Sequence, residues 1–320
     1  MSSTLIYMSS LKEPSFLQSS YWQSFQESLG HKTIYVDGKG YSCLLVERTT
    51  KVGDYLLAPC GPTADSLGSL AKSLEHIKQA GKQSGASWLK IEPHCEAAQK
   101  SQIESTVIAA GGQKATRNFN PGTTRIIDLR PSIDQIFAGL SSTNRTLIRR
   151  NDKANGITFT TSTRPADINL FVQMVKTVES RNKVHFYSNE YYTKQADTLM
   201  PAGVMFLELA YYQNKPVAST IIHQFDAMAS YTYAASLPEA RDTNASTLLA
   251  WQAIKNTKDR GATKFDFFGV APPDAPADHP WQGFSAFKAK FGGQIIDFAG
   301  TWDIPLSPRY KLYKLAKRVT

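Results

Sequence analysis

The sequence has few of the features that mark disulfide-rich, metal-binding or membrane-spanning proteins. Its three cysteines, Cys43, Cys60 and Cys95, are widely spaced and include no Cys-x-x-Cys pair, which argues against a disulfide framework and against a zinc site. The six histidines show neither metal-ligand spacing nor a partner for a nucleophilic triad. No run approaches the roughly 18 apolar residues that a membrane-spanning helix needs. We therefore expect no metal, and a reducing compartment.

The first residues also lack the pattern of a secretion signal. Residues 1–8 contain no basic segment, and their apolar stretch is too short for a signal core. Hydrophobic residues make up 42% of the chain and charged residues 20%, which is typical of a globular protein. A chain of 320 residues is long for one hydrophobic core. The sequence predicts a soluble, cytoplasmic protein with two lobes.

Acidic residues are outnumbered by basic ones, which gives a formal net charge of +9. Such a charge attracts polyanions, among them RNA, phosphorylated substrates and anionic lipid headgroups. An ordinary solvated basic surface explains the same charge equally well. Composition alone leaves the two interpretations open.

A weak internal repeat with an offset of 176 residues (231 minus 55) suggests how the lobes are built. In the first half, a strand at 55–58, a helix at about 65–83 and a strand at 85–91 follow one another. In the second half, the corresponding segments are 231–234, about 245–260 and 261–267, and further strands are expected at 205–209 and 217–222. Strands that alternate with helices predict an α/β core. Two similar α/β lobes would leave a cleft between them, where ligands commonly bind.

A basic helix is predicted over residues 141–155, before Gly156. Arg145, Arg149 and Lys153 recur at every fourth position, which places their cations on one helix face. The stripe could contact phosphates or could be solvated, and the spacing does not decide between these.

The stretch from Tyr231 to Trp302 resembles the Fem family of peptidoglycan-branching aminoacyltransferases. Its most specific element is Phe-Lys-x-x-Phe-Gly-Gly, with Lys288 as its lysine, after an Asp-containing strand. Further matching segments are Tyr231–Ser236, Leu248–Ile254, Phe265–Gly269 and Gly283–Phe284, and the 145–156 helix resembles the family's interlobe helix.

The resemblance implies two tandem lobes, each like a GNAT acyltransferase domain, in an α/β (α+β) fold. We expect a first lobe of residues 1–140 plus 303–320 and a second lobe of 141–302. No room exists between Phe171 and Met205 for a coiled-coil arm, so the match is to the compact type. A final helix is predicted to begin at Pro305 and to dock on the first lobe. Its lysines make it a candidate surface for tRNA or for peripheral membrane contact.

The resemblance also implies the activity. Family members transfer an amino acid from aminoacyl-tRNA to a peptidoglycan precursor, either lipid-linked or UDP-linked, and need no cofactor because the ester is already activated. We expect a monomer. The family's functional lysine matches Lys288, a cation for the tRNA 3′ end or the oxyanion, with Lys290 as the weaker candidate for that role. Asp266 would orient the amine or a water. Tyr233 is the third candidate for a catalytic residue. Each residue could instead be structural.

Other residues are predicted to bind substrate. Tyr191 and Tyr233 match positions that contact the precursor, and Tyr231 is expected to point the same way as Tyr233 by the strand period of two. Phe268 and Phe287 flank the catalytic candidates. Compact relatives carry an arginine for the precursor's phosphates where this chain has Phe186-Tyr187-Ser188, so Arg181 and Lys183 are the substitutes. The tRNA contacts are assigned to Arg145, Arg149 and Lys290.

Two other functions compete with this one. A GNAT-like enzyme would use acyl-CoA, but the segment Leu237–Asn244 contains none of the glycines that typically hold the CoA pyrophosphate at a helix N-terminus. A non-catalytic module that binds RNA or the cell envelope would keep the charge without needing Lys288.

Overall fold

The computed structural model describes residues 15–95, 98–154, 156–182 and 186–316, and the side chains of 152–154 and 181–182 are outside the description. Two compact units share the chain. Unit 1 comprises Met1–Gly122 and Asp297–Thr320, and unit 2 comprises Thr123–Ile296. Each unit has its own mixed sheet and its own hydrophobic core.

Unit 1 is built around a sheet in the order β6-β4-β2-β3-β5-β15-β7, with β1 paired to β2. Its strands are β1 (Thr33–Gly38), β2 (Tyr41–Thr50), β3 (Gly53–Ala58), β4 (Thr63–Ala64), β5 (Trp88–Ile91), β6 (His94–Cys95), β7 (Gln113–Lys114) and β15 (Trp302–Pro305). Its helices are η1 (Phe16–Gln18), α1 (Ser20–Ser28), α2 (Leu67–Gln83), α3 (Lys100–Ala109) and α11 (Arg309–Ala316).

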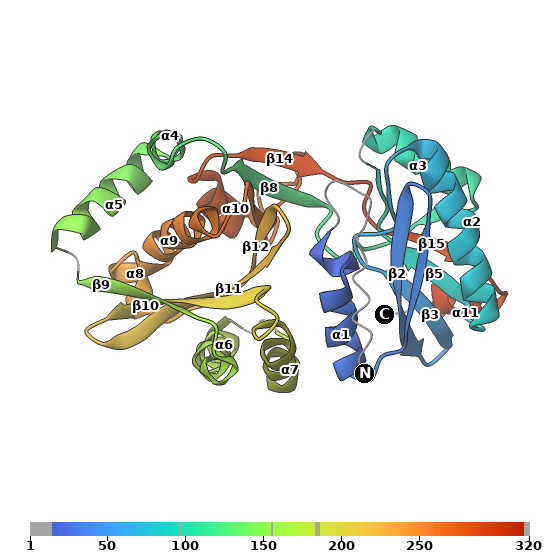
Figure 1. Ribbon diagram of the computed structural model, residues 1–320, viewed down its shortest axis with the longest axis horizontal. Coiled ribbons are helices and arrows are strands. Elements are labelled where there is room, and N and C mark those ends of the chain that lie inside the picture. The colour runs from blue at the N-terminus through green and yellow to red at the C-terminus, as the bar shows by residue number, and fades with distance from the viewer. Residues whose placement is uncertain (1–14, 96–97, 155, 183–185, 317–320) are drawn as a thin grey trace. The chain divides into compact units, whose positions relative to one another are not determined.

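The helix α2 covers one face of this sheet, and α1 lies on the other (Figure 1). The buried residues of α2, Leu70, Leu74 and Ile77, recur at helical spacing, as an amphipathic helix requires. The Ser66 hydroxyl accepts a hydrogen bond from the Ser69 N–H and caps the first turn. Burial of this apolar stripe against β2 and β5 is what holds α2 in place.

Unit 2 contains a sheet in the order β14-β8-β13-β12-β11-β10-β9. Its strands are β8 (Thr123–Asp128), β9 (Ile157–Ser162), β10 (Met205–Tyr212), β11 (Lys215–Phe225), β12 (Met228–Ser236), β13 (Lys264–Gly269) and β14 (Gln294–Asp297). Its helices are α4 (Ile133–Ala138), α5 (Ser142–Ala154), η2 (Pro165–Asp167), α6 (Ile168–Asn182), α7 (Asn189–Leu199), α8 (Glu239–Asp242), α9 (Ala245–Asp259) and α10 (Gln282–Ala289).

The helix α9 packs on one face of this sheet, and α6 and α7 pack on the other (Figure 1). Leu248, Leu249 and Ile254 of α9 lie in one core with Phe206 and Phe265 of the strands. No long arm interrupts the described part of the chain between α6 and β10, as expected for the compact type.

The predicted repeat is confirmed as a strand–helix–strand unit in each half. In unit 1, the chain runs from β3 through β4 and α2 to β5, and β3 pairs with β5 in parallel. In unit 2, it runs from β12 through α8 and α9 to β13, and β12 pairs with β13 in parallel. A parallel pair needs a long crossover connection, and the helix supplies it.

The chain passes between the units at 122/123 and 296/297, whereas the sequence predicted boundaries at 140/141 and 302/303. The first difference arises because β8 pairs with β13, which places β8 and the following α4 in unit 2. The two passing segments meet within unit 1, where the Phe298 N–H donates to the Gly122 carbonyl at 2.8 Å.

The carboxylate of Glu92 connects the two passing segments to the loop after β3. Glu92 accepts hydrogen bonds from the Cys60 N–H at 3.0 Å, from the backbone and side chain of Asn120 at 2.6 Å each, and from the Thr301 hydroxyl at 2.8 Å. Glu92 is buried. A buried carboxylate with this many donors fixes the loops that supply them.

The expected start of the final helix is wrong. Pro305 is the last residue of β15, and α11 begins four residues later, at Arg309. Trp302 and Ile304 are buried in the core of unit 1, and β15 pairs with β5 in an antiparallel register. This pairing extends the chain through Pro305. In the described residues, no helix is both long and apolar enough to cross a membrane.

Candidate active site

Lys288 lies in the last turn of α10 and turns its amine toward the end of β13. Its Nζ donates a hydrogen bond to the Gly269 carbonyl at 2.7 Å and approaches the Phe268 carbonyl at 3.5 Å. The Nζ also sits 5.0 Å from the centre of the Phe284 ring, a cation–π distance. The side chain is thus oriented by unit 2 rather than extended into solvent.

A bulge at the end of β13 presents these carbonyls. Asp266 pairs with Ile126 of β8 and Gly269 pairs with Thr124, so β13 contains one extra residue over this interval. Phe268 has a left-handed backbone, with φ of +59°, which is uncommon for a residue with a side chain. Bulges often re-aim groups beside active sites, and here the bulge turns two carbonyls toward one amine.

Asp266 is fixed by the same bulge. Its Oδ1 accepts hydrogen bonds from the Phe268 N–H, at 2.7 Å, and from the Thr124 hydroxyl. Burial raises the pKa of Asp266, while these hydrogen bonds and the charge of Lys288 oppose the rise. Both hydrogen bonds act on one oxygen, so the carboxylate has a defined orientation.

Burial also lowers the pKa of Lys288, to about 8 from an ordinary 10.5, and the charge of Asp266 opposes this shift. Removal from water disfavours the ammonium form of a lysine. At neutral pH the amine is therefore charged but close to its titration point, as in many functional sites.

A cluster of tyrosines forms a second group in unit 2. Tyr187 and Tyr191 stack with ring centres 4.1 Å apart, and the hydroxyls of Tyr191 and Tyr233 lie 3.5 Å apart. Ser188 caps α7 by accepting from the Tyr191 N–H, which fixes the start of the helix that carries Tyr191. Burial raises the pKa of Tyr233 well above its usual value. The structure thus brings the predicted pair Tyr191 and Tyr233 together, and burial favours the neutral form of Tyr233.

The expectation that Tyr231 points the same way as Tyr233 is wrong. A register shift between Ile221 and Ile222 inserts an extra residue into β12, so that Ile221 pairs with Tyr233 and Ile222 with Tyr231. Tyr231 is buried and packs on the ring of Phe267 on the α9 side, whereas Tyr233 faces the tyrosines of α7. A bulge breaks the period of two.

The first two cations of the predicted stripe contact α4. Arg145 donates to the carbonyls of Ala138, at 3.0 Å, and Leu140 at the end of that helix, and the Arg149 guanidinium lies 5.2 Å from the Phe137 ring centre. Arg145 therefore connects α4 to α5. The side chains of Lys153 and Arg181 and the whole of Lys183 lie outside the described residues.

The Gly-Gly pair after Lys290 shapes the end of α10. Lys290 is exposed, and its carbonyl accepts from the Ser141 N–H at 2.9 Å. Gly293 has a φ of +76°, and a Cβ at this position would meet the Ile126 carbonyl at 2.5 Å. Only glycine allows β8 and the segment after α10 to approach this closely.

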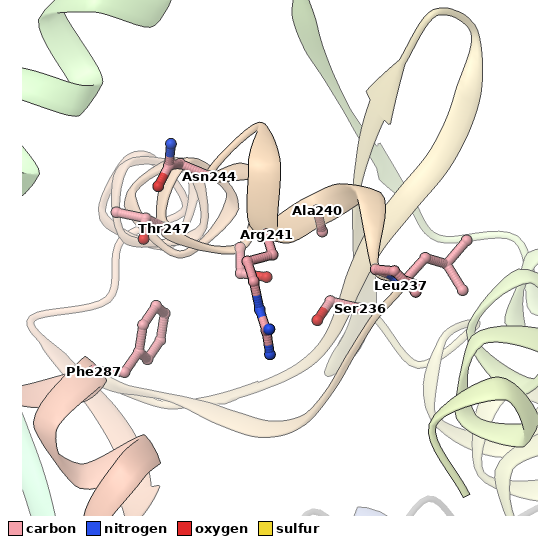
Figure 2. A pocket seen from close by; sticks show the side chains of 9 residues that line it. Ser236, Leu237, Ala240, Arg241, Asn244, Thr247 and Phe287 are labelled. Carbon is pink, nitrogen blue, oxygen red and sulfur yellow. The ribbon is translucent and has the colours of Figure 1, made fainter. Parts of the chain in front are cut away.

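A cavity of about 270 Å³ lies beside the N-terminus of α9 and was not found from the sequence. Figure 2 shows the Arg241 side chain extending between Ser236 and Phe287. The glycine-free segment Leu237–Asn244, which contains the short helix α8, forms one wall of this cavity. The lining residues are Ser236, Leu237, Pro238, Ala240, Arg241, Asn244, Ser246, Thr247 and Phe287.

The polar groups around this cavity suit an anion or a sugar. Ser246 and Thr247 lie in the first turn of α9, where backbone N–H groups and the helix dipole favour negative charge. Arg241 adds a cation, and Phe287 adds an aromatic ring. Among the described residues, no group of three His, Cys, Asp or Glu side chains is placed to hold a metal ion.

Comparison with known proteins agrees with this fold. The FemAB family model matches residues 6–215 and 207–318. A crystal structure of FemX superposes with a TM-score of 0.83 at 17% identity and covers 96% of this chain and 95% of that chain. The structure of L-PGS from Bacillus licheniformis gives a TM-score of 0.57 at 14% identity, covering 96% and 98%.

A tandem GNAT protein from the clavulanic acid biosynthesis pathway gives a TM-score of 0.54 at 15% identity, covering 84% of this chain and 80% of that one. No curated protein matches the sequence. The two units are tandem GNAT-like domains, and the chain belongs to the FemAB family of peptidoglycan-branching aminoacyltransferases.

Proposed function

We propose that this protein transfers an amino acid from aminoacyl-tRNA to the peptide stem of a peptidoglycan precursor in the cytoplasm, during interpeptide bridge formation. The observation that carries the proposal is the oriented amine of Lys288. It is held 2.7 Å from the Gly269 carbonyl with a pKa of about 8, close to the pH at which the reaction would run.

The reaction is a simple aminolysis. The neutral acceptor amine attacks the ester carbonyl of the aminoacyl-tRNA, a C–N bond forms, and the C–O bond to the ribose breaks. The proton lost by the amine ends on the leaving ribose oxygen. The tetrahedral intermediate carries an oxyanion, and the charged Lys288 stabilises it in our proposal. Asp266 is a positioning residue that also supports the charge of Lys288.

The cavity of unit 2 is the proposed site for the tRNA 3′ end. Arg241 and the first turn of α9 would bind its phosphate, and Phe287 would stack against a base or ribose. Phe287 directly precedes Lys288, so one helix would contact both the tRNA end and the reacting ester. Exposed Lys290 and Arg149 are the proposed contacts farther along the tRNA.

Tyr191 and Tyr233 are proposed to bind the precursor, because their paired hydroxyls suit a ligand of sugars and peptide bonds. Phe268, at the bulge, would border the same reacting centre. Arg181 and Lys183 remain the proposed partners of the precursor's diphosphate, and they do not separate a lipid-linked from a UDP-linked form.

An acyl-CoA enzyme is the less favoured alternative. The segment Leu237–Asn244 contains the short helix α8 and no glycine. A glycine-bearing loop is what would let backbone N–H groups surround a pyrophosphate. Arg241 offers a side-chain cation in its place, which suits a single phosphodiester.

The test uses a mixed pool of tRNAs charged with radiolabelled amino acids. The protein is incubated with this pool and with either a UDP-linked or a lipid-linked precursor, and a parallel reaction contains acetyl-CoA. We expect labelled precursor only from the charged tRNA. Lys288→Met should abolish transfer, and Lys72→Met, on the exposed face of α2, should not. Acetyl transfer alone, or equal activity of both variants, would contradict the proposal.

A further inference from the structure

The helix α11 is anchored to unit 1 by one face. Tyr310 is buried and donates its hydroxyl proton to Asp303 at 3.1 Å. Tyr313 stacks on Trp88 with ring centres 4.4 Å apart and an interplanar angle of 25°. Asp303 in turn accepts from Lys90 at 2.5 Å in a buried ion pair. These contacts fix which side of α11 faces outward.

The outward face combines aliphatic and cationic groups. Leu312 and Leu315 are 57% and 58% exposed, and a spacing of three residues places them on one side of the helix. Arg309 and Lys311 are also exposed. Lys314 is directed toward unit 1, because its amine donates to Gln113 at 2.6 Å and lies 5.7 Å from the centre of the Tyr310 ring. The helix contains no acidic residue, and the sequence continues with Lys317 and Arg318.

We propose that α11 docks this protein on a membrane that contains anionic lipid. Two exposed leucines on a short cationic helix match the pattern of an interfacial amphipathic helix, whose apolar side chains enter the acyl boundary while its cations contact lipid phosphates. The net charge of +9 adds attraction to the same surface. The proposal goes beyond the transferase reaction and does not depend on it.

RNA is the competing partner for these cations, but the two exposed leucines favour a membrane over RNA. A phosphate backbone would attract Arg309 and Lys311, but it would leave Leu312 and Leu315 in water. A bilayer uses both kinds of side chain. With only two leucines in one short helix, binding is weak and reversible, and it depends on the charge of the lipid.

The experiment is sedimentation of the full chain with vesicles of phosphatidylcholine, with or without about 30 mol % phosphatidylglycerol. We expect binding to the anionic vesicles only, and loss of binding at high salt. Leu312→Ser combined with Leu315→Ser should lower the partition coefficient into vesicles by roughly 30-fold or more. Arg309→Gln combined with Lys311→Gln should lower it roughly 30-fold.

Ile108→Ser is the matched control, because Ile108 lies on α3 of the same unit and is also 58% exposed. Its partition should equal that of the unaltered protein. Equal binding by the leucine double variant, or no binding of the unaltered protein to anionic vesicles, overturns the proposal. If the double variant instead weakens tRNA retention on filters and leaves vesicle binding unchanged, the surface is an RNA site and the proposal fails.

Discussion

The charge state of Lys288 makes a quantitative prediction about how transfer depends on pH. If the ammonium stabilises the oxyanion, activity should fall as the group loses its proton. With a pKa of about 8, about a tenth of the amine is charged at pH 9, so this contribution falls about tenfold per pH unit above 8. An unperturbed lysine would show the same fall only near its usual pKa of 10.5.

The variant Lys288→Arg isolates this effect, because a guanidinium stays charged throughout the range. The assay is single-turnover transfer from aminoacyl-tRNA at saturating precursor, with initial rates from pH 6.5 to 9.5. The acceptor amine titrates in both proteins and cancels in the ratio of their rates. The ratio of unaltered protein to Lys288→Arg should be flat below pH 7 and then decline with a midpoint near pH 8.

Asp266→Asn sharpens the test. The Asp266 charge raises the pKa of Lys288 against the effect of burial, so its removal should move the decline to lower pH. A ratio that is independent of pH would refute the claim that the Lys288 charge acts in transfer. A ratio that rises through pH 8 would mean that the neutral amine acts as a base, which contradicts the oxyanion assignment.

Three further predictions concern stability and substrate binding. Gly293→Ala should lower the free energy of unfolding by about 2–4 kcal/mol, because its Cβ would meet the Ile126 carbonyl at 2.5 Å, whereas Gly283→Ala, with open space around it, should leave the urea midpoint unchanged or raise it slightly. Glu92→Ala should cost about 1–3 kcal/mol in the same urea titration, because four hydrogen-bond donors, among them the buried Thr301 hydroxyl, lose their acceptor. Tyr233→Phe should raise the KM for the precursor several-fold without a change in melting temperature, since only one hydroxyl contact is lost.

Each of these has a clear contrary result. Equal urea midpoints for the two glycine variants would mean that β8 and the Gly293 segment separate without cost. A small effect of Glu92→Ala would show that the passing segments are held by other contacts. An unchanged KM in Tyr233→Phe would remove that tyrosine from the precursor site.

The fold was largely predictable because local periodicity and the overall topology agree. Apolar spacing placed α2 within 65–83 and α9 within 245–260, and both helices form there. The boundary at 140 failed for a different reason. Nothing in residues 123–128 indicates that this strand pairs with β13, more than 130 residues later, because strand partners are chosen by tertiary packing.

The site was predicted in part, and the failures have local causes. Lys288 was found from its motif, and the structure places it against the bulge at Phe268. Tyr231 was misassigned because a bulge in β12 reverses the alternation of side chains. Arg145 fits a phosphate-binding stripe on a helical wheel, yet its guanidinium is used by the carbonyls that end α4. The spacing of residues along one helix does not show which neighbouring element its cationic side chains contact.

The pairing of β15 between β5 and β7 has a consequence for biosynthesis. The sheet of unit 1 lacks the strand that connects β5 to the edge strand β7 until residues 302–305 have been made. On the ribosome, β5 and β7 therefore lack this partner while the whole of unit 2 is synthesised and can fold. Such edges invite pairing with other chains. Synthesis in a permuted order, with 297–320 fused ahead of residue 15, should remove this delay.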